Sequence, residues 1–392
     1  MRNAIAVMNT KGGVGKSTLV LALAETLSAH YGKNVLIIDS DAQTSISAML
    51  LTPASLHRLQ SDGLTIVDLL VASVLNNVAV DWPRFVVGGV SDVDEARSVY
   101  LVPSDMQLTL FEREVSKESL HGKLRSSIGA LLNHVRGVFD IVLIDCPPGL
   151  SVLTESWLRE ADFHLSPTKP DYVSTCGLEV FRRFKGLNPE MGFADNLGVI
   201  VNMKDAYSSV DADYQRWLME NSDNRCFPQA VPRTSALQVA AQLSPVERSY
   251  VAKYPGESGA CVRAVAEELI TRLTAANRAA AQAKPPPAPA KAAEPAAPTT
   301  PKALEAATVV PPAAPAQAPA APARQAPPAT PARVVVAASG AAAAPAAGTR
   351  PVPVAPVEPA RPAAPRVVRA VAPQAKAATP PPPPQSKPTL IK

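Results

Sequence analysis

The sequence predicts an α/β fold built on a mostly parallel β-sheet with helices on both of its faces. Short runs of apolar residues recur along the chain, and longer stretches with helical periodicity separate them. Continuous apolar runs are typical of strands buried on both faces, and strands that alternate with helices build parallel sheets. Two of the runs end at an aspartate, so we expect acidic side chains at the carboxyl edge of the sheet.

The N-terminal part of the chain shows this alternation most clearly. Ile5–Met8 is predicted as the first strand, and a glycine-rich loop leads from it into a helix over Ser17–Tyr31. Gly32 follows at the position where a helix end favours a residue that tolerates positive φ. The second strand, Val35–Ile38, ends at Asp39.

The alternation of strands and helices is expected to continue to the end of the folded domain. Further strands are predicted at the apolar runs Val99–Val102, Ile141–Ile144, Phe163–Leu165, Val199–Val201 and Ala230–Val231. One helix is predicted to begin after a cap at Ser104 or Asp105, and a second helix is predicted to end near Arg136. Further helices are predicted over Ile66–Leu75, Tyr172–Phe184, Asp211–Glu220 and Gly259–Ala281. The stretch from Leu51 to Val90 has the weakest pattern, and we assign no chemistry to it.

Composition divides the chain near residue 280. Residues 281–392 contain 29 of the 41 prolines and 38 alanines, with no Phe, Trp or Tyr. Such a segment cannot bury enough apolar surface to offset its ordering entropy, so we expect a disordered Ala/Pro-rich tail after a folded domain over residues 1–280. The tail has 12 Lys or Arg against 3 Asp or Glu, whereas residues 1–280 have 26 against 31.

Several classes of protein are not expected. The sequence has no apolar run of about 18 residues, the length that a transmembrane helix requires. Its first residues lead directly into a strand without the small-residue cleavage site of a signal peptide. The four cysteines form no CxxC pair, which argues against a zinc site and a disulfide framework. We therefore expect a reduced, cytoplasmic protein.

The loop between the first strand and the first helix carries the strongest motif, Lys11-Gly12-Gly13-Val14-Gly15-Lys16-Ser17-Thr18. Glycines let the backbone approach phosphate oxygens, and the amides at a helix N-terminus attract anions. Lys16 can reach the β- and γ-phosphates, and the Ser17 hydroxyl can hold Mg²⁺. Thr10 stands where the standard phosphate-binding loop has its first glycine. The motif predicts a P-loop NTPase.

With its second lysine, Lys11, this loop resembles the deviant Walker A box of the ParA/MinD family of dimeric P-loop ATPases. The resemblance covers roughly residues 1–276. Val35–Gln43 is similar to the second block of the family, with Ala42 in place of the usual proline, and Asp140–Gly149 is similar to the Walker B strand and switch. Further matches are Ala161–Asp162, Ser166–Pro170, Gly177–Leu178, Asn202 and Val231–Arg233.

The acidic residues at the predicted strand ends are the candidates for binding the metal and for positioning the water that attacks the phosphate. Asp145, at the end of an apolar strand, is placed to bind Mg²⁺ through water, as carboxylates at this edge commonly do. The resemblance implies that Asp39 supports the same metal with Ser17, and that Asp41 positions or activates the attacking water. A helix cap at Asp145 and a structural turn at Asp41 are the alternatives.

The resemblance also assigns roles at the two ends of the nucleotide. It implies that Lys11 reaches the phosphates of a partner subunit, so that ATP holds a dimer together, while Lys16 serves its own subunit. It further implies that Asn202 reads adenine and that the backbone near Pro232 and Arg233 lines the base. Taken together, the expected ATP-binding residues are Lys11, Gly12, Gly13, Val14, Gly15, Lys16, Ser17, Thr18, Asn202, Pro232 and Arg233, and the expected catalytic residues are Lys11, Lys16 and Asp41. An exposed loop lysine and a strand-end turn residue are the alternatives for Lys11 and Asn202.

The resemblance favours a ParA-type ATPase that binds DNA nonspecifically, responds to a ParB-like or other adaptor protein, and positions a plasmid, a chromosome or a protein cargo. With so little sequence before the first strand, we expect no operator-binding domain. A MinD-like ATPase that acts through a partner without DNA is the alternative; the proline-rich end of the chain does not suit a membrane-binding helix. DNA contacts are expected among Arg233, Arg248, Lys253, Arg263, Arg272 and Arg278. The tail is either a second DNA contact or a spacer and polyproline ligand, with its docking segment at Pro380–Pro384.

Overall fold

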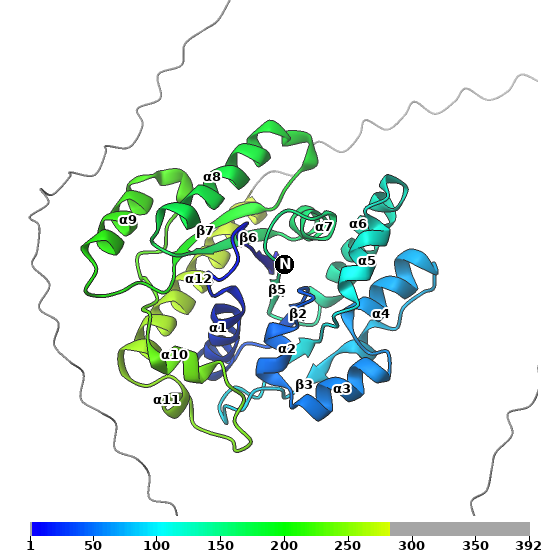
Figure 1. Ribbon diagram of the computed structural model, residues 1–392, viewed down its shortest axis with the longest axis horizontal. Helices are drawn as coiled ribbons and strands as arrows, with labels where there is room; N and C mark the ends of the chain where they lie inside the picture. Colours follow the sequence, from blue (N-terminus) through cyan, green and yellow to red (C-terminus); the bar gives the residue numbers. More distant parts are fainter. Residues whose placement is uncertain (1, 283–392) are drawn as a thin grey trace, which may run out of the picture. The chain divides into compact units, whose positions relative to one another are not determined.

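Seven strands form one sheet at the centre of the molecule, in the order β3-β4-β2-β5-β1-β6-β7 (Figure 1). All neighbouring strands run parallel except the short β3, which is antiparallel to β4. The strands are β1 (Ala4–Val7), β2 (Val35–Asp39), β3 (Val87–Gly88), β4 (Val99–Val102), β5 (Ile141–Asp145), β6 (Phe163–Thr168) and β7 (Asp195–Val201). The computed structural model describes residues 2–282, and this architecture confirms the predicted α/β fold with a mostly parallel sheet.

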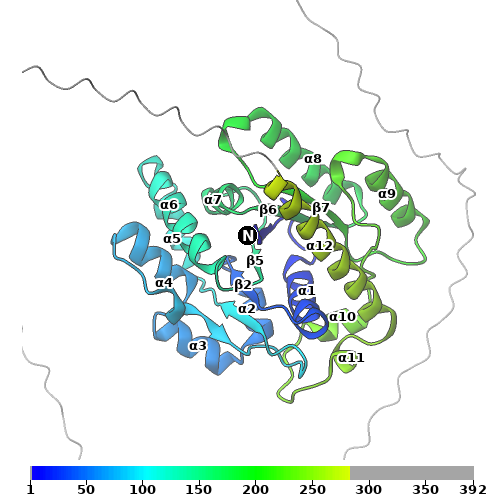
Figure 2. The same cartoon turned by 180° about the vertical axis from the view of Figure 1, so that it is seen from behind.

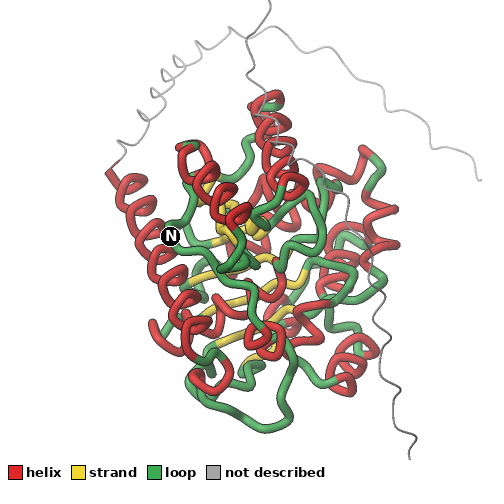
Figure 3. The backbone as a smooth tube through the Cα atoms, turned by 60° about the vertical axis from the view of Figure 1, so that its left-hand side comes forward, coloured by secondary structure: helices red, strands yellow, loops and turns green. Residues whose placement is uncertain are grey.

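Helices cover both faces of this sheet, as the yellow strands between red helices in Figure 3 show. The α-helices are α1 (Lys16–Tyr31), α2 (Ser45–Leu50), α3 (Pro53–Ser61), α4 (Ile66–Leu70), α5 (Leu108–Val115), α6 (Glu118–Val135), α7 (Val152–Glu160), α8 (Tyr172–Leu187), α9 (Ser209–Glu220), α10 (Ser235–Ala240), α11 (Tyr250–Lys253) and α12 (Gly256–Gln282). Val71–Leu75 forms a π-helical turn, and Trp82–Phe85, Pro189–Met191 and Ser222–Asn224 form short 3-10 helices. None of the helices within residues 2–282 is both long enough and apolar enough to cross a membrane.

Alternate residues of the central strand β1 explain the two layers. Ile5 and Val7 pack into the apolar layer that contains α1 and α12, whereas Ala4 and Ala6 pack into the layer that contains α6 and α7. Every residue of β1 is fully buried. Because neither face of the strand meets water, its sequence is a continuous apolar run rather than an alternating one.

Three sequence predictions differ from the structure. Ala230–Val231 is not a strand; the Val231 amide donates to the Val201 carbonyl at 2.8 Å, and an isolated parallel bridge between Lys204 and Pro232 follows. The helix predicted over Ile66–Leu75 changes into the π-helical turn after Leu70. Short elements that the sequence analysis missed are β3, α2, α3, α7, α10 and α11.

The domain boundary predicted at residue 280 falls inside α12, which continues to Gln282. The remainder of the predicted tail, residues 283–392, lies outside the described residues. The C-terminal part of α12 is hydrogen-bonded to the start of the chain. Asn277 accepts a hydrogen bond from the Arg2 amide at 2.9 Å and donates one to the Arg2 carbonyl at 2.8 Å. Figure 2 shows the yellow end of α12 beside the N-terminus.

Candidate nucleotide-binding site

The glycine-rich loop lies between β1 and α1, at the carboxyl edge of the sheet. Gly13 and Gly15 have φ values of 73° and 80°, in the left-handed region that favours glycine. Gly15 is also the N-cap of α1, and no side chain caps this helix start. The amides of the first turn are therefore free to bind an anion.

Polar side chains outside the glycines fix the course of the loop. The Asn9 amide donates to the Pro167 carbonyl at 2.8 Å, and its oxygen accepts from the Lys11 amide at 2.9 Å. The Thr10 hydroxyl donates to the Gly177 carbonyl at 3.1 Å. A Cβ at Gly177 would lie 2.6 Å from that hydroxyl oxygen, so the close approach of α8 to the loop requires glycine. The threonine that departs from the standard motif therefore joins the loop to α8.

The two lysines of the loop differ in exposure. Lys16 is 7% exposed, whereas Lys11 is half-buried at the loop entrance. Neither ammonium group forms an ion pair or a hydrogen bond with other residues in the range 2–282. A cation held without a protein partner at a helix N-terminus suits a phosphate group.

Asp39 and Asp145 lie side by side at the carboxyl ends of β2 and β5, where they occupy the same register, and Val7 of β1 pairs with Asp145 on its other side. The first phosphate-loop residues and both carboxylates therefore meet at one edge of the sheet.

Asp145 is buried, and neither of its carboxylate oxygens accepts a hydrogen bond from the described residues. Burial, and next the charge of Asp39, raise the pKa of Asp145 to about 8, although Ser17 and Lys16 act in the opposite direction. A buried carboxylate with no protein donor is unfavourable unless a cation compensates it. The chemistry of Asp145 therefore fits a divalent cation, and its place in a metal site stays a prediction.

Asp39 is equally buried but has protein partners. One of its oxygens accepts from the Ser47 hydroxyl at 2.6 Å and the Ser47 amide at 3.0 Å, and the other accepts from the Asp41 amide at 3.2 Å. Burial raises the pKa of Asp39 to about 6 despite these donors. Asp41 is half-exposed, and its own carboxylate accepts from the Gln43 amide at 2.9 Å. Asp39 is thus held in a fixed orientation next to Asp145, while Asp41 is partly open to solvent.

A pocket of about 500 Å³ adjoins the phosphate loop. It brings together Gly15 and Thr18 of the loop with the predicted residues Asn202, Pro232 and Arg233. Backbone hydrogen bonds fix its far wall, because Lys204 donates to Val231 at 3.1 Å and Arg233 donates to Lys204 at 2.8 Å. Lining residues that the sequence analysis did not assign are Leu19, Ala22, Met203, Val231, Thr234, Leu237, Gln238 and Val262. The pocket has the position and the mostly apolar walls that a nucleotide base requires.

Asn202 lies at the junction of the pocket and the loop. Its side-chain amide donates to the Val14 carbonyl at 2.9 Å and to the Gly15 carbonyl at 3.3 Å, and its oxygen accepts from the Met203 amide at 3.0 Å. Asn202 therefore braces the phosphate loop in this structure. Its predicted contact with adenine stays a prediction.

The switch segment that follows Asp145 is anchored at its far end. Gly149 has a φ of 93°, and the Ser151 hydroxyl, which caps α7, donates to Glu112 of α5 at 2.7 Å. At its near end, the Cys146 amide donates to the Val7 carbonyl at 3.2 Å. Beyond the segment, the Trp157 indole of α7 donates to the Ser40 hydroxyl, directly after β2, at 2.6 Å. No local sequence signal links Glu112 or Trp157 to this loop, since both contacts depend on the tertiary fold.

Three of the six basic residues predicted to contact DNA have structural roles instead. Lys253 is 2% exposed and forms ion pairs with Glu25 at 2.7 Å and Asp92 at 2.6 Å, so the prediction for Lys253 was wrong. Arg272 donates to the Leu197 carbonyl at 2.9 Å and pairs with Glu268, and Arg248 pairs with Asp92. Arg233 and Arg278 are exposed and Arg263 is half-buried.

Comparisons with known proteins agree with this site. A family model for the AAA domain matches residues 2–189. The chromosome partitioning protein ParA of Caulobacter vibrioides is 28% identical over 275 residues, which cover 68% of this chain and 94% of that protein. The chromosome-partitioning ATPase Soj of Treponema pallidum is 26% identical over 278 residues, which cover 69% of this chain and 98% of Soj.

The fold is similar to that of the cobyrinic acid a,c-diamide synthase from Mycobacterium smegmatis, solved with bound ADP and magnesium. That comparison has a TM-score of 0.55 and 22% identity, and it covers 70% of this chain and 97% of the synthase. At this identity the likeness shows the fold alone.

The site and the sequence relatives point to the same class of protein. Lys11 and Lys16 lie in a glycine loop at a helix N-terminus, two aspartates meet beside it at the sheet edge, and the chain aligns with ParA and Soj over nearly their whole lengths. The loop, the paired aspartates and these relatives support a P-loop ATPase of the ParA/MinD type.

Proposed function

We propose that this ATPase is a positioning ATPase of the ParA type. It uses ATP and Mg²⁺, forms a homodimer when ATP is bound, and contacts DNA without sequence preference. A ParB-like or other adaptor protein stimulates hydrolysis, and the cycle moves a plasmid, a chromosome or a protein cargo over the nucleoid. ParA and Soj, which are named for chromosome partitioning, support this proposal as relatives.

The phosphate groups are held by the loop amides and by Lys16 at the start of α1. The Ser17 hydroxyl and Asp145 would hold Mg²⁺, and Ser47 orients Asp39 next to Asp145. When bound, the metal neutralises charge on the transferring phosphoryl group. Asp41, on the open side of the site, orients the attacking water. Phosphoryl transfer depends mainly on such positioning and charge neutralisation.

The exposure of Lys11 is the observation that carries the dimer proposal. Lys16 already lies buried where the phosphates of its own subunit bind, whereas Lys11 lies at the loop entrance without an ionic partner among residues 2–282. A half-buried lysine that is unpaired among residues 2–282 is available to a phosphate brought by a second subunit. We infer that it completes the phosphate site of the partner.

Two substitutions test this assignment by light scattering with and without ATP. Lys11→Ala retains ATP binding but loses ATP-dependent dimerisation and hydrolysis, because the partner's phosphates lose their second cation. Asp41→Ala dimerises on ATP and does not hydrolyse it, because only the water position is lost. A Lys11→Ala protein that still dimerises on ATP overturns the role of Lys11 across the subunits.

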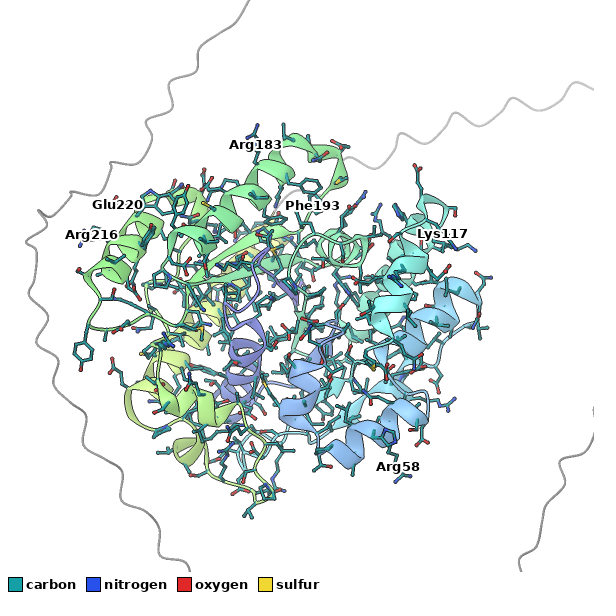
Figure 4. All side chains as sticks on the ribbon, viewed as in Figure 1. Arg58, Lys117, Arg183, Phe193, Arg216 and Glu220 are labelled. Carbon is teal, nitrogen blue, oxygen red and sulfur yellow. The ribbon has the colours of Figure 1, made fainter. Side chains whose placement is uncertain are left out.

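The DNA surface is proposed among the exposed basic residues. Arg233 and Arg278 remain from the predicted set, and Figure 4 shows Arg183 of α8 and Arg216 of α9 projecting from the outer surface. Contacts to phosphates give position without sequence. Each phosphate contact contributes roughly 0.9 to the slope of log affinity against log salt, so Arg183→Ala should lower both DNA affinity and that slope.

An adaptor-dependent ATPase that does not bind DNA is the second candidate. It is favoured by the acidic balance of residues 1–280, 26 basic against 31 acidic, and by the structural roles of Lys253, Arg248 and Arg272. Binding of the full chain to random-sequence duplex DNA, with ATP and at several salt concentrations, separates the two. Saturable binding with a salt-dependent slope supports the ParA type, and the absence of binding at low salt supports the second candidate.

A further inference from the structure

The pocket of about 500 Å³ beside the phosphate loop has mostly apolar walls, which can hold any purine ring by packing. Discrimination between adenine and guanine requires hydrogen bonds to the groups at the edge of the ring. The polar side chains that line this pocket are Thr18, Asn202, Arg233, Thr234 and Gln238. Those whose donors or acceptors are not used within the protein are the candidates for selecting the base.

Three of these polar side chains have other roles. The Asn202 side-chain nitrogen donates to two carbonyls of the phosphate loop, at 2.9 and 3.3 Å. The Thr234 hydroxyl accepts from an amide in the first turn of α10 at 3.3 Å and lies 3.0 Å from the hydroxyl of Ser258 in α12. Thr18 lies in the first turn of α1, at the phosphate end of the site. We therefore expect the base to be selected by one of the other two side chains.

The side chains of Gln238 and Arg233 have no hydrogen-bond or ionic partner among residues 2–282. Both residues are exposed and both line the pocket, so they lie at its mouth. A side chain without a protein partner can exchange its water for a ligand group, and no internal hydrogen bond is lost in the exchange. These two side chains are thus available to the edge of a bound base.

The backbone at Gln238 is held in place by the packing of α10. Its neighbours Leu237 and Ala240 are buried in the apolar layer that contains α1 and α12. Figure 1 shows α10 beside α1, with which it is in contact. The carboxamide of Gln238 can therefore rotate, but it does so from a fixed point on the pocket wall.

The two available groups suit different purines. A carboxamide has one donor and one acceptor side by side, and so have the amino group and ring nitrogen N7 of adenine, so the two can form a pair of hydrogen bonds. A guanidinium has donors alone, which match O6 and N7 of guanine because both of these atoms are acceptors. The sequence relatives support an ATPase. The carboxamide of Gln238 is the group whose pattern fits ATP.

We propose that Gln238 selects adenine over guanine by pairing its carboxamide with the amino group and N7 of the base. This inference rests on the proposed function, in which ATP binds beside the phosphate loop, and it adds the residue that discriminates between nucleotides. Guanine in the same position brings O6 toward the carboxamide oxygen, which then has no donor from which to accept. Asn202 keeps its role as a brace of the loop.

Titration calorimetry of the full chain with Mg²⁺ and the β,γ-methylene analogues of ATP and GTP tests this inference. We expect the parent to bind the ATP analogue at least about tenfold more tightly than the GTP analogue. Gln238→Leu should bind the ATP analogue about tenfold more weakly and the GTP analogue equally well, so that the preference disappears. Inorganic tripolyphosphate, which has no base, should bind the parent and the variant equally.

Two further variants isolate the contact. Gln242→Leu is the matched control, because Gln242 is an exposed glutamine just after α10 that is not among the residues lining the pocket; it should keep the preference of the parent. Arg233→Ala should change the affinities for both analogues by the same factor, since a guanidinium that does not contact the base acts equally on the phosphates that both analogues share.

Three results would overturn the role of Gln238: equal binding of both analogues by the parent, an unchanged preference in Gln238→Leu, or loss of the preference in Arg233→Ala. A parent that binds tripolyphosphate but neither analogue more tightly would overturn the base pocket itself. A parent that binds none of the three ligands would overturn the whole nucleotide site, and this inference with it.

Discussion

The phosphate side and the base side of the nucleotide site are built in different ways. Between β1 and α1, consecutive residues offer a phosphate the uncapped backbone amides of a helix start and the buried Lys16. The base pocket instead collects side chains from α1, the end of β7, the segment after Val231 and α12. The first needs a fixed backbone path, whereas the second needs only a cavity of suitable shape.

This difference explains why the two sides are unequally visible in the sequence. On the phosphate side, glycines with positive φ, lysines and the start of a helix must follow one another in a fixed order, so they form a recognisable sequence motif. Apolar contacts accept many residue types, and in this pocket they are contributed by segments far apart in the chain. Three substitutions test whether the two sides also separate energetically.

Lys16→Ala should have the largest effect. Removing a buried cation that faces a bound phosphate costs about 2–5 kcal/mol, so ATP and inorganic tripolyphosphate should both bind at least about thirtyfold more weakly. Titration calorimetry measures both ligands, with Lys123→Ala on the exposed surface of α6 as the control. Unchanged tripolyphosphate binding would contradict the phosphate role of Lys16.

Asp145→Asn should stabilise the nucleotide-free protein at neutral pH. The folded pKa of Asp145, about 8, lies above its ordinary value of 3.8, so the folded state binds more protons than the unfolded state, and stability falls as the pH rises from about 4 to about 8. Asparagine removes this loss, which amounts to about 1–4 kcal/mol at pH 7. Thermal denaturation between pH 4 and pH 8 should therefore show parent and variant diverging as the pH rises. Parallel curves would show that Asp145 ionises in the folded state as it does in water.

Met203→Ala should have the smallest effect, and only on the base side. Met203 lines the pocket and does not touch the metal position, so losing its apolar contact should weaken ATP binding about three- to tenfold. Binding of tripolyphosphate should stay the same. Met219→Ala, at an exposed methionine of α9, is the matched control. An equal loss of affinity for ATP and for tripolyphosphate would show that the base side and the phosphate side do not contribute independently to binding.

The sequence predicted the sheet, and the adjacency of the glycine loop to the two strand-end aspartates, because both depend on local patterns. Asp39 and Asp145 end apolar runs, and parallel pairing places them together. The contacts that complete the site lie beyond local patterns: Ser47 orients Asp39, Asn9 fixes the loop to Pro167, and the Asn202 amide is turned toward the loop carbonyls. Each joins residues whose proximity is decided by packing.

The prediction of a DNA contact at Lys253 failed for the same physical reason. A lysine in a short amphipathic stretch is usually solvated, but α11 packs its lysine against Glu25 of α1 and Asp92. Burial raises the pKa of Glu25, and the Lys253 ammonium opposes this change. Only the tertiary fold places two carboxylates around one ammonium group.

That buried cluster constrains how the chain can change over evolutionary time. Arg248 also pairs with Asp92, so the cluster contains two carboxylates and two cations. Neutralising one of Glu25, Asp92 or Lys253 leaves an unmatched charge in the interior, at a cost of about 3–5 kcal/mol, whereas replacing the whole cluster with apolar residues is close to neutral. A single substitution at any of these positions therefore destabilises the fold, and the compensating substitutions must arise at nearly the same time. Positions 25, 92 and 253 should consequently co-vary among homologous chains, and this shared variation would identify α1 and α11 as neighbours without any structure.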